Sequence, residues 1–170
     1  MKQNSDKQPK IIILRGNSAS GKTTVARLLQ SQIDPHPLLI EQDYFRRMVI
    51  KEKDGPNVIN PELILETIKF GLRHQRHVII EGIFARKNYY SLFNELVKIH
   101  PTQNFFFYFD IPFAETLRRH ATKLEVHMYG QKEMRKWWNN HDVLQGDDIL
   151  IGPESSVEET VRFIRRMIDL

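Results

Sequence analysis

The sequence predicts an α/β fold in which helices cover a parallel sheet. Short apolar runs rich in β-branched or aromatic residues recur along the chain, and most of them end at a polar residue or a glycine. Such runs are typical of strands buried on both faces of a parallel sheet. Segments with apolar residues at helical spacing separate them, which is the alternation expected for right-handed crossovers. The predicted strands cover residues 10–14, 37–40, 77–80, 105–109 and, more weakly, 147–151.

Helices are predicted between these strands, at residues 23–33, 44–52, 61–73 and 88–99, with a last helix near the C-terminus. Asn60 precedes Pro61, and this pair is typical of an N-cap residue followed by a first-turn proline. The last helix follows Ser155 and Ser156, and each serine has a glutamate three residues later, as in a capping box. These end signals indicate where two of the helices begin.

Length and composition favour one globular domain. The chain has 170 residues, fewer than the roughly 250 at which chains usually divide into domains. It contains no cysteine, which excludes disulfide scaffolds and thiolate metal sites. No apolar run reaches the roughly 18–20 residues that cross a bilayer, and residues 1–9 are polar, unlike a secretory signal. We therefore predict a cytoplasmic monomer or homodimer with a flexible arm over residues 1–9 and one domain over residues 10–170.

The strongest motif is Gly16-Asn-Ser-Ala-Ser-Gly21-Lys22-Thr23, a full match to the phosphate-binding loop pattern. A predicted strand precedes it and a predicted helix follows, as the pattern requires. Its glycines allow successive backbone N–H groups to point at phosphate oxygens, and the helix start adds further donors. We expect the nucleotide to contact the loop and helix start: Gly16, Asn17, Ser18, Ala19, Ser20, Gly21, Lys22, Thr23 and Thr24.

Two side chains of this loop carry the expected chemistry. Lys22 is a cation that can reach the β- and γ-phosphates and act in catalysis, and the Thr23 hydroxyl can bind Mg²⁺. ATP and Mg²⁺ are therefore the predicted cofactors. The alternative is a Gly/Ser turn that binds nothing, but the complete motif in the right context favours a nucleotide site.

Asp43 follows the second predicted strand, in the segment Glu41-Gln-Asp43-Tyr-Phe-Arg46-Arg47. Ligands gather at the carboxyl ends of the strands in open parallel sheets, so Asp43 is expected at the same rim as the loop. A carboxylate there can orient or deprotonate an acceptor hydroxyl. Arg46 or Arg47 can hold the acceptor or the transferred phosphoryl group. The alternative is that Asp43 only caps the following helix.

A second acidic signal follows the third predicted strand, in the segment Val78-Ile-Ile-Glu81-Gly82. A buried strand that ends in an acid has the form of a Walker B element, so Glu81 is predicted to reach Mg²⁺ or its water shell. Gly82 would leave room for substrate or phosphate. Phe84 is predicted to line the acceptor pocket, although a place in the core is equally compatible with its residue type.

Basic residues concentrate at residues 112–140, which hold six basic and three acidic residues and so contribute +3 to a net charge of +4. We expect a lid at about residues 118–140, because arginines brought down by a lid can neutralise a transferring phosphoryl group and exclude water. Arg119 and Arg135 are the predicted catalytic arginines. The alternative is a solvated helical face. Trp137 and Trp138 are predicted to pack against the body of the protein.

With these residues assembled, residues 10–170 resemble the small P-loop kinases of the nucleoside and nucleotide kinase-like superfamily. The resemblance implies a three-layer P-loop NTPase fold with five parallel strands in the order 2-3-1-4-5 and a small lid. It also implies that Pro153, in Gly152-Pro-Glu154, lies near the adenine. The segment around Asp43 and Arg46 is similar to the acceptor segment of polynucleotide kinases and chloramphenicol phosphotransferases. Uridine and gluconate kinases have similar layouts.

The sequence departs from the usual family pattern at one position, since Glu81 stands where a Walker B aspartate is common. The predicted activity is transfer of the γ-phosphoryl group of Mg–ATP to a hydroxyl of a small molecule, for example a nucleoside. One alternative is a nucleic-acid 5′-hydroxyl kinase, which a net charge of only +4 supports weakly. The other is an ATP-binding switch without transfer activity, which would have no need of Asp43.

Overall fold

The computed structural model describes residues 8–170 apart from 54, 56–57, 123–128, 145 and 147. Its centre is a five-stranded parallel sheet with the order β2-β3-β1-β4-β5, which confirms the predicted fold class and strand order. The strands are β1 (Ile11–Gly16), β2 (Leu38–Glu41), β3 (Val78–Gly82), β4 (Asn104–Phe109) and β5 (Asp148–Ile151). β1 and β3 are buried along their whole length, which explains why they read as continuous apolar runs.

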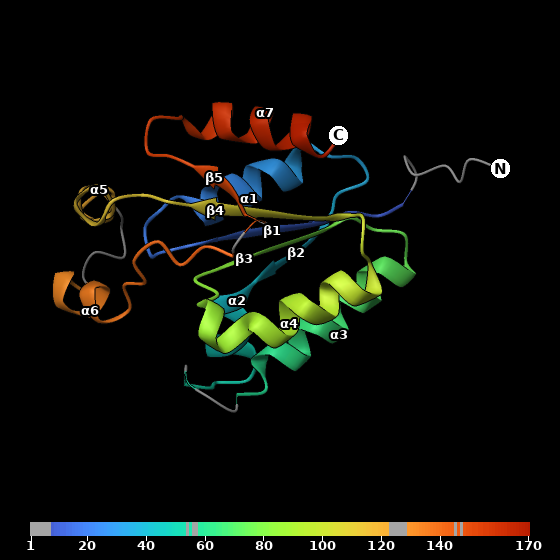
Figure 1. The fold of residues 1–170 in the computed structure, drawn as a ribbon, viewed down its shortest axis with the longest axis horizontal. Helices are drawn as coiled ribbons and strands as arrows, with labels where there is room; N and C mark the ends of the chain where they lie inside the picture. The colour runs from blue at the N-terminus through green and yellow to red at the C-terminus, as the bar shows by residue number, and fades with distance from the viewer. Residues whose placement is uncertain (1–7, 54, 56–57, 123–128, 145, 147) are drawn as a thin grey trace.

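Helices cover both faces of the sheet (Figure 1). One face carries α1 (Lys22–Ser31) and α7 (Val157–Met167), and the other carries α3 (Asn60–Arg73) and α4 (Arg86–Ile99). Side chains of β1 alternate between the two cores, because Ile11 and Ile13 join the α3/α4 core while Ile12 and Leu14 join the α1/α7 core. The three layers hold the sheet rigid, so its carboxyl edge can position functional groups.

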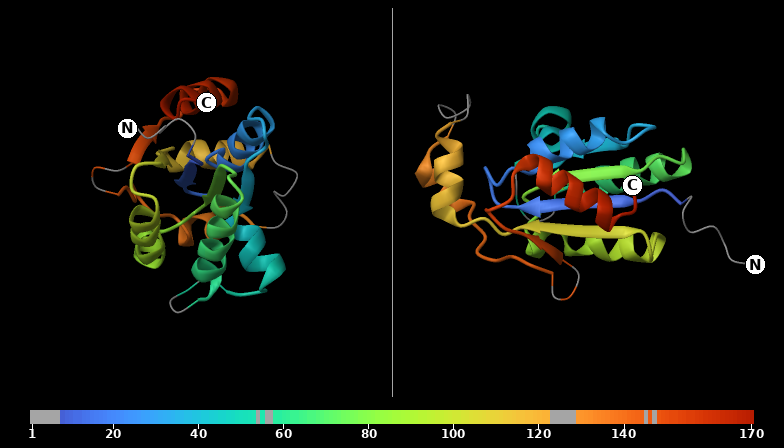
Figure 2. Two further views of the ribbon diagram at one scale, coloured as in Figure 1. Left: turned by 90° about the vertical axis from the view of Figure 1, so that its right-hand side faces the viewer. Right: turned by 90° about the horizontal axis from the view of Figure 1, so that it is seen from above.

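Two further helices lie beyond the carboxyl ends of the strands, away from the two helical layers (Figures 1 and 2). They are α5 (Phe113–His120) and α6 (Gln131–Lys136). Together they make up most of the described part of the predicted lid, whose residues 123–128 are outside the described chain, as are residues 1–7 of the predicted arm. Among the described helices, none combines the length and the apolar character needed to cross a membrane.

The segment after β2 differs from the single helix predicted for residues 44–52. A short helix, α2 (Gln42–Tyr44), passes directly into a π-helical turn, η2 (Phe45–Val49). The wider turn is visible in the backbone, where the Ile50 N–H donates to the Phe45 carbonyl and the Glu52 N–H to the Arg46 carbonyl. π-helical turns are rare and often occur at functional sites. This one carries Arg46 and Arg47 beside Asp43.

The predicted N-cap role of Asn60 is wrong. Asn60 is the first residue of α3, and its buried side chain turns inward to donate to the Tyr89 hydroxyl at 3.3 Å. The Glu52 carboxylate instead accepts from the backbone N–H groups of Ile59 (3.0 Å) and Asn60 (3.2 Å). The N–H groups of Glu62 and Leu63, which an Asn60 cap would bind, donate to the Ile59 carbonyl, so tertiary packing decides this helix start.

Candidate active site

The loop between β1 and α1 has the backbone conformation that phosphate binding requires. Gly16 has φ +144°, and a Cβ atom there would lie 2.8 Å from the Phe109 carbonyl oxygen. Gly21 has φ +104° and precedes the first residue of α1. Side chains other than glycine rarely adopt these angles, so both motif glycines are explained by the geometry. Ala19 also has a positive φ of 58°, a strained conformation of the kind that clusters at ligand sites.

Lys22 is buried and its ammonium group lies inside the loop. Its Nζ atom donates to the Asn17 carbonyl at 2.7 Å and to the Ser20 Oγ at 3.1 Å. The Asn17 carbonyl also accepts from the Ser20 N–H at 3.4 Å. The loop therefore wraps around the cation, which is the charge that a bound polyphosphate would meet.

Thr23 and Glu81 are brought together as predicted. The Thr23 Oγ1 donates to the Glu81 Oε1 at 3.0 Å, although the two residues are 58 positions apart in sequence. Burial raises the pKa of the Glu81 carboxyl, and the nearby Lys22 charge and Thr23 hydroxyl lower it only in part. A hydroxyl beside a carboxylate is an oxygen donor set that suits Mg²⁺. The described residues contain no cluster of three acidic or histidine ligands, so phosphate oxygens and water would have to complete the coordination.

The raised pKa of Glu81 predicts that the stability of the protein depends on pH. Ionising a carboxyl whose folded-state pKa lies above its unfolded value lowers the free energy of unfolding as the pH rises above about 4.5. We therefore expect Glu81→Gln to have a higher Tm than the wild-type protein at pH 8 and an equal Tm at pH 4. Differential scanning calorimetry measures both.

Glu66→Gln is the matched control for this prediction, because the exposed Glu66 carboxyl has its pKa lowered by Lys69. Its removal is expected to give no gain in Tm at pH 8. A lower Tm for Glu81→Gln than for the wild-type protein at pH 8 would contradict the conclusion that burial of the ionised Glu81 carboxyl lowers the free energy of unfolding.

The structure places Asp43, Arg46 and Arg47 at one cavity of about 500 Å³. Arg46 Nη2 binds the Asp43 Oδ1 at 2.5 Å, and Arg47 Nε lies 3.2 Å from the same oxygen. Both of these interactions go to Oδ1, and the Asp43 side chain is 59% exposed. Two guanidinium groups thus fix the carboxylate, and its second oxygen stays open to a ligand. We call this space the acceptor cavity.

The acceptor cavity adjoins the phosphate-binding loop through two connections. Asn139 lines the cavity and exchanges two hydrogen bonds with Asn17: the Asn17 Nδ2 donates to the Asn139 carbonyl at 2.7 Å, and the Asn139 N–H donates to the Asn17 Oδ1 at 2.9 Å. Ile83 also lines the cavity and follows the Glu81-Gly82 pair directly. The loop and the cavity are therefore neighbours at the carboxyl edge of the sheet.

Arg119 contacts the loop but is not among the residues that line the acceptor cavity. Its Nη1 donates to the Ser20 carbonyl and its Nη2 to the Pro153 carbonyl, each at 3.0 Å. Arg119, Gly152 and Ser155 line a small hollow beside the loop and the start of α7. Arg119 thus links the loop to Pro153, the residue that the resemblance places near the adenine.

Arg135 lies apart from both the loop and the acceptor cavity. Its guanidinium group stacks 4.6 Å from the centre of the Phe113 ring, and the residue is exposed. Lys136, the next residue, lines the cavity. Trp138 packs edge-on against Phe113, the first residue of α5, whereas Trp137 is 40% exposed and forms part of the cavity wall. The prediction that both tryptophans pack against the body is therefore wrong for Trp137.

Gly82 and Phe84 have packing contacts where substrate contacts were predicted. A Cβ atom at Gly82 would lie 2.6 Å from the Gln42 Cβ, so the glycine makes room for a neighbouring side chain. Phe84 is 1% exposed and packs edge-on against Tyr89 and Phe93 in the α3/α4 core. The alternative reading of Phe84 as a core residue is the one that this packing supports.

The two remaining loop residues of the predicted nucleotide site face different surroundings. Thr24 is exposed on the first turn of α1. The Ser18 Oγ lies 3.2 Å from the hydroxyl of Tyr129, which immediately precedes α6. The predicted lid region and the loop are therefore already in contact in the ligand-free protein.

Residues 11–136 match the family described as the AAA domain. Curated relatives include uridine kinase-like protein 5 of Arabidopsis thaliana, 37% identical over 37% of this chain, and uridine kinase of Ligilactobacillus salivarius, 34% identical over 39% of it. The matches span only 16% and 36% of those two proteins. Among solved structures, a sugar kinase from Janibacter is 17% identical with a TM-score of 0.75 and covers 95% of each chain. The chain belongs to the AAA domain family, and its fold is that of the P-loop kinases.

Proposed function

We propose that the protein transfers the γ-phosphoryl group of ATP to a hydroxyl of a small molecule. The observation that carries the proposal is the juxtaposition of a complete phosphate-binding loop and a cavity that presents the open oxygen of Asp43. A nucleotide switch needs the first feature but has no use for the second. The uridine kinase and sugar kinase relatives support phosphoryl transfer as the reaction class.

The donor side is assigned to the loop and its neighbours. Backbone N–H groups of the loop and the start of α1 would hold the phosphates, with Lys22 as their cation. Thr23 and Glu81 would hold Mg²⁺, which supplies charge neutralisation at the β- and γ-phosphates when bound. The base would lie near Pro153, whose carbonyl accepts from Arg119 beside the loop.

The acceptor side is assigned to Asp43 and the arginines that fix it. In the reaction, the acceptor oxygen forms a bond to the γ-phosphorus while the bond from that phosphorus to the β,γ-bridging oxygen breaks, and ADP leaves. The acceptor hydroxyl donates its hydrogen bond, and at transfer its proton, to the Asp43 Oδ2. Arg46 and Arg47, which pair with the Asp43 carboxylate, would hold it toward the acceptor and offset charge on the transferring group.

A lid over residues 118–140 remains part of the proposal. The Ser18–Tyr129 and Asn17–Asn139 hydrogen bonds join the segments on both sides of α6 to the loop, which supports a role of this region at the nucleotide. Arg119 would act at the nucleotide, through the carbonyl of Ser20, rather than at the acceptor. Arg135 would have to leave the Phe113 ring to reach the transferring phosphoryl group.

Lys22→Ala tests the donor side of the proposal. The substitution removes the cation that the loop encloses, so we expect ATP affinity to fall by about tenfold to a hundredfold, the effect of losing a charge-assisted contact to phosphate. Isothermal titration calorimetry with Mg–ATP measures this. Lys69→Ala on α3, whose exposed side chain pairs with Glu66, is the control and is expected to bind ATP as the wild-type protein does. Unchanged affinity in Lys22→Ala would refute the assigned nucleotide site.

A further inference from the structure

The acceptor cavity carries far more positive than negative charge. Five basic side chains and one carboxylate line it among the described residues: Arg46, Arg47, Lys53, Lys87, Lys136 and Asp43. The two arginines are engaged by Asp43. None of the three lysines forms an ion pair with a carboxylate in the described part of the chain. Glu133, three residues before Lys136 in α6, binds the Gly130 N–H, and the pKa of its carboxyl is lowered first by that hydrogen bond and in smaller part by the charge of Lys136.

The three lysines come from three separate elements. Lys53 lies between η2 and α3, Lys87 in the first turn of α4, and Lys136 at the end of α6. Cations that converge from separate segments on one cavity repel one another, and a bound anion relieves that repulsion. The first turn of α4 contains no acidic residue, although the Asp142 carboxylate accepts from the Arg86 N–H at 2.8 Å.

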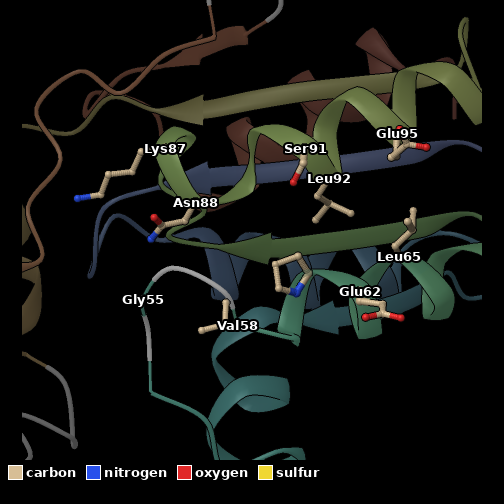
Figure 3. Close-up of a pocket in the computed structure, with 10 residues that line it drawn as sticks. Gly55, Val58, Glu62, Leu65, Lys87, Asn88, Ser91, Leu92 and Glu95 are labelled. Atoms are coloured by element: carbon tan, nitrogen blue, oxygen red, sulfur yellow. The ribbon is translucent and has the colours of Figure 1, made fainter.

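Carboxylates are placed in the neighbouring cavity instead. A second cavity of about 510 Å³ lies between α3 and α4 and shares Lys87 and Asn88 with the acceptor cavity (Figure 3). Glu62 and Glu95 line this second cavity, together with Lys87. The acceptor cavity, in contrast, has Asp43 as its one carboxylate among the described residues.

We infer that the acceptor is a small hydroxyl compound that also carries an anionic group, a phosphate or a carboxylate, which Lys53, Lys87 and Lys136 bind. The inference rests on the proposed function and narrows its substrate class. The γ-phosphoryl group has its own cation in Lys22, so the three lysines are available to the acceptor. An anionic acceptor would offset the net positive charge of this cavity, which a neutral acceptor would not, and the exposed face of Trp137 and the amide of Asn139 can contact the uncharged part.

A binding experiment on the nucleotide-loaded protein decides the inference. The protein is saturated with Mg²⁺ and the non-hydrolysable analogue β,γ-imido-ATP, which fills the loop, and is then titrated calorimetrically with matched pairs. The pairs are glycerol 3-phosphate with glycerol, ribose 5-phosphate with ribose, and gluconate with sorbitol. We expect at least one anionic member to bind about tenfold or more tightly than its neutral partner, the effect of one charge-assisted contact.

Lysine variants locate the effect. Lys87→Gln and Lys136→Gln are expected to weaken binding of the preferred anion by about threefold to tenfold, as losing one of several cations does. The neutral partner should bind each variant as it binds the wild-type protein. Lys98→Gln is the matched control, because Lys98 is exposed on the same helix as Lys87 and lies outside the acceptor cavity. It should change neither affinity.

The outcomes separate this inference from the proposed function. The inference is overturned by equal binding within every pair, by an absence of binding for all the anions, or by binding of only a 5′-hydroxyl oligonucleotide. It is also overturned when the lysine variants weaken both members of a pair alike, since the lysines would then serve the nucleotide. The proposed function fails on a different readout: an anion that binds selectively but yields no phosphorylated product with ATP, by mass spectrometry, supports the inference and refutes the transfer reaction.

Discussion

Asp43→Asn is expected to slow phosphoryl transfer by about 10²- to 10⁴-fold while ATP binding stays unchanged, because the amide cannot take the acceptor proton. The amide occupies nearly the same volume, so the change removes charge and basicity rather than shape. Both arginines contact Oδ1 of Asp43. The side-chain oxygen of an asparagine can take the place of Oδ1 and accept the hydrogen bond from Arg46. Single-turnover phosphorylation of the best acceptor from a screen of hydroxyl compounds measures the rate, and calorimetry measures ATP affinity.

Asp169→Asn provides the control for this prediction. Asp169 is exposed near the C-terminus with φ 51°, a conformation that asparagine tolerates, and it lies outside the acceptor cavity. Its transfer rate should equal that of the wild-type protein. Retention of more than about a tenth of the wild-type rate in Asp43→Asn would refute the base role, since general base catalysis contributes at least a hundredfold. The capping alternative for Asp43 would then be preferred.

Arg15→Leu is expected to lower the free energy of unfolding by about 3–5 kcal/mol, the cost of removing one partner of a buried ion pair. The Arg15 side chain is fully buried next to the phosphate-binding loop. It donates to Asp148 at 2.6 Å and to Asp142 at 3.1 Å, and its guanidinium group stacks near the ring of Tyr108. The leucine would leave two carboxylates without their cation, one of them buried. Denaturant unfolding followed by circular dichroism measures the loss.

Two further variants keep this prediction testable if Arg15→Leu does not fold. Asp142→Asn should cost less than half as much, because the Asp142 side chain is 23% exposed and Arg15 keeps its buried partner Asp148. Arg27→Leu removes an exposed arginine that pairs with Glu41 and should cost no more than about 1 kcal/mol. A loss in Arg15→Leu as small as that in Arg27→Leu would mean that the ion pair contributes little.

Local sequence patterns are consistent with the geometry of the phosphate-binding loop. The two motif glycines have the positive φ angles that the phosphate-binding loop implies, and Thr23 meets Glu81. The Thr23–Glu81 contact depends on strand ends that the parallel sheet brings to one edge, whereas the glycine angles follow from a short-range constraint, because a glycine is needed wherever a side chain would clash. The capping box at Ser156 and Glu159 is confirmed for the same reason, since both partners lie within one helical turn.

The acceptor half could be predicted only in part. The rim position of Asp43 follows from its place after a strand, but the cavity beside it combines residues from η2, α4 and α6 and the loops next to them. Nothing local in Lys53 or Lys87 distinguishes them from lysines on a solvated face. Phe84 shows the reverse error, because a residue just after a strand end can point into the core as readily as into a pocket.

By itself, the sequence determined the parallel α/β sheet, its strand order by resemblance, the phosphate-binding loop and the acids that accompany it. The tertiary structure alone decided that Arg119 bridges the loop and Pro153, that Asn17 pairs with Asn139, and that three lysines surround one cavity. The physical reason is the separation in sequence between the residues that determine each feature. Backbone conformation and helix capping depend on residues a few positions apart, whereas the charge of a cavity depends on which distant segments the packed sheet brings to its edge.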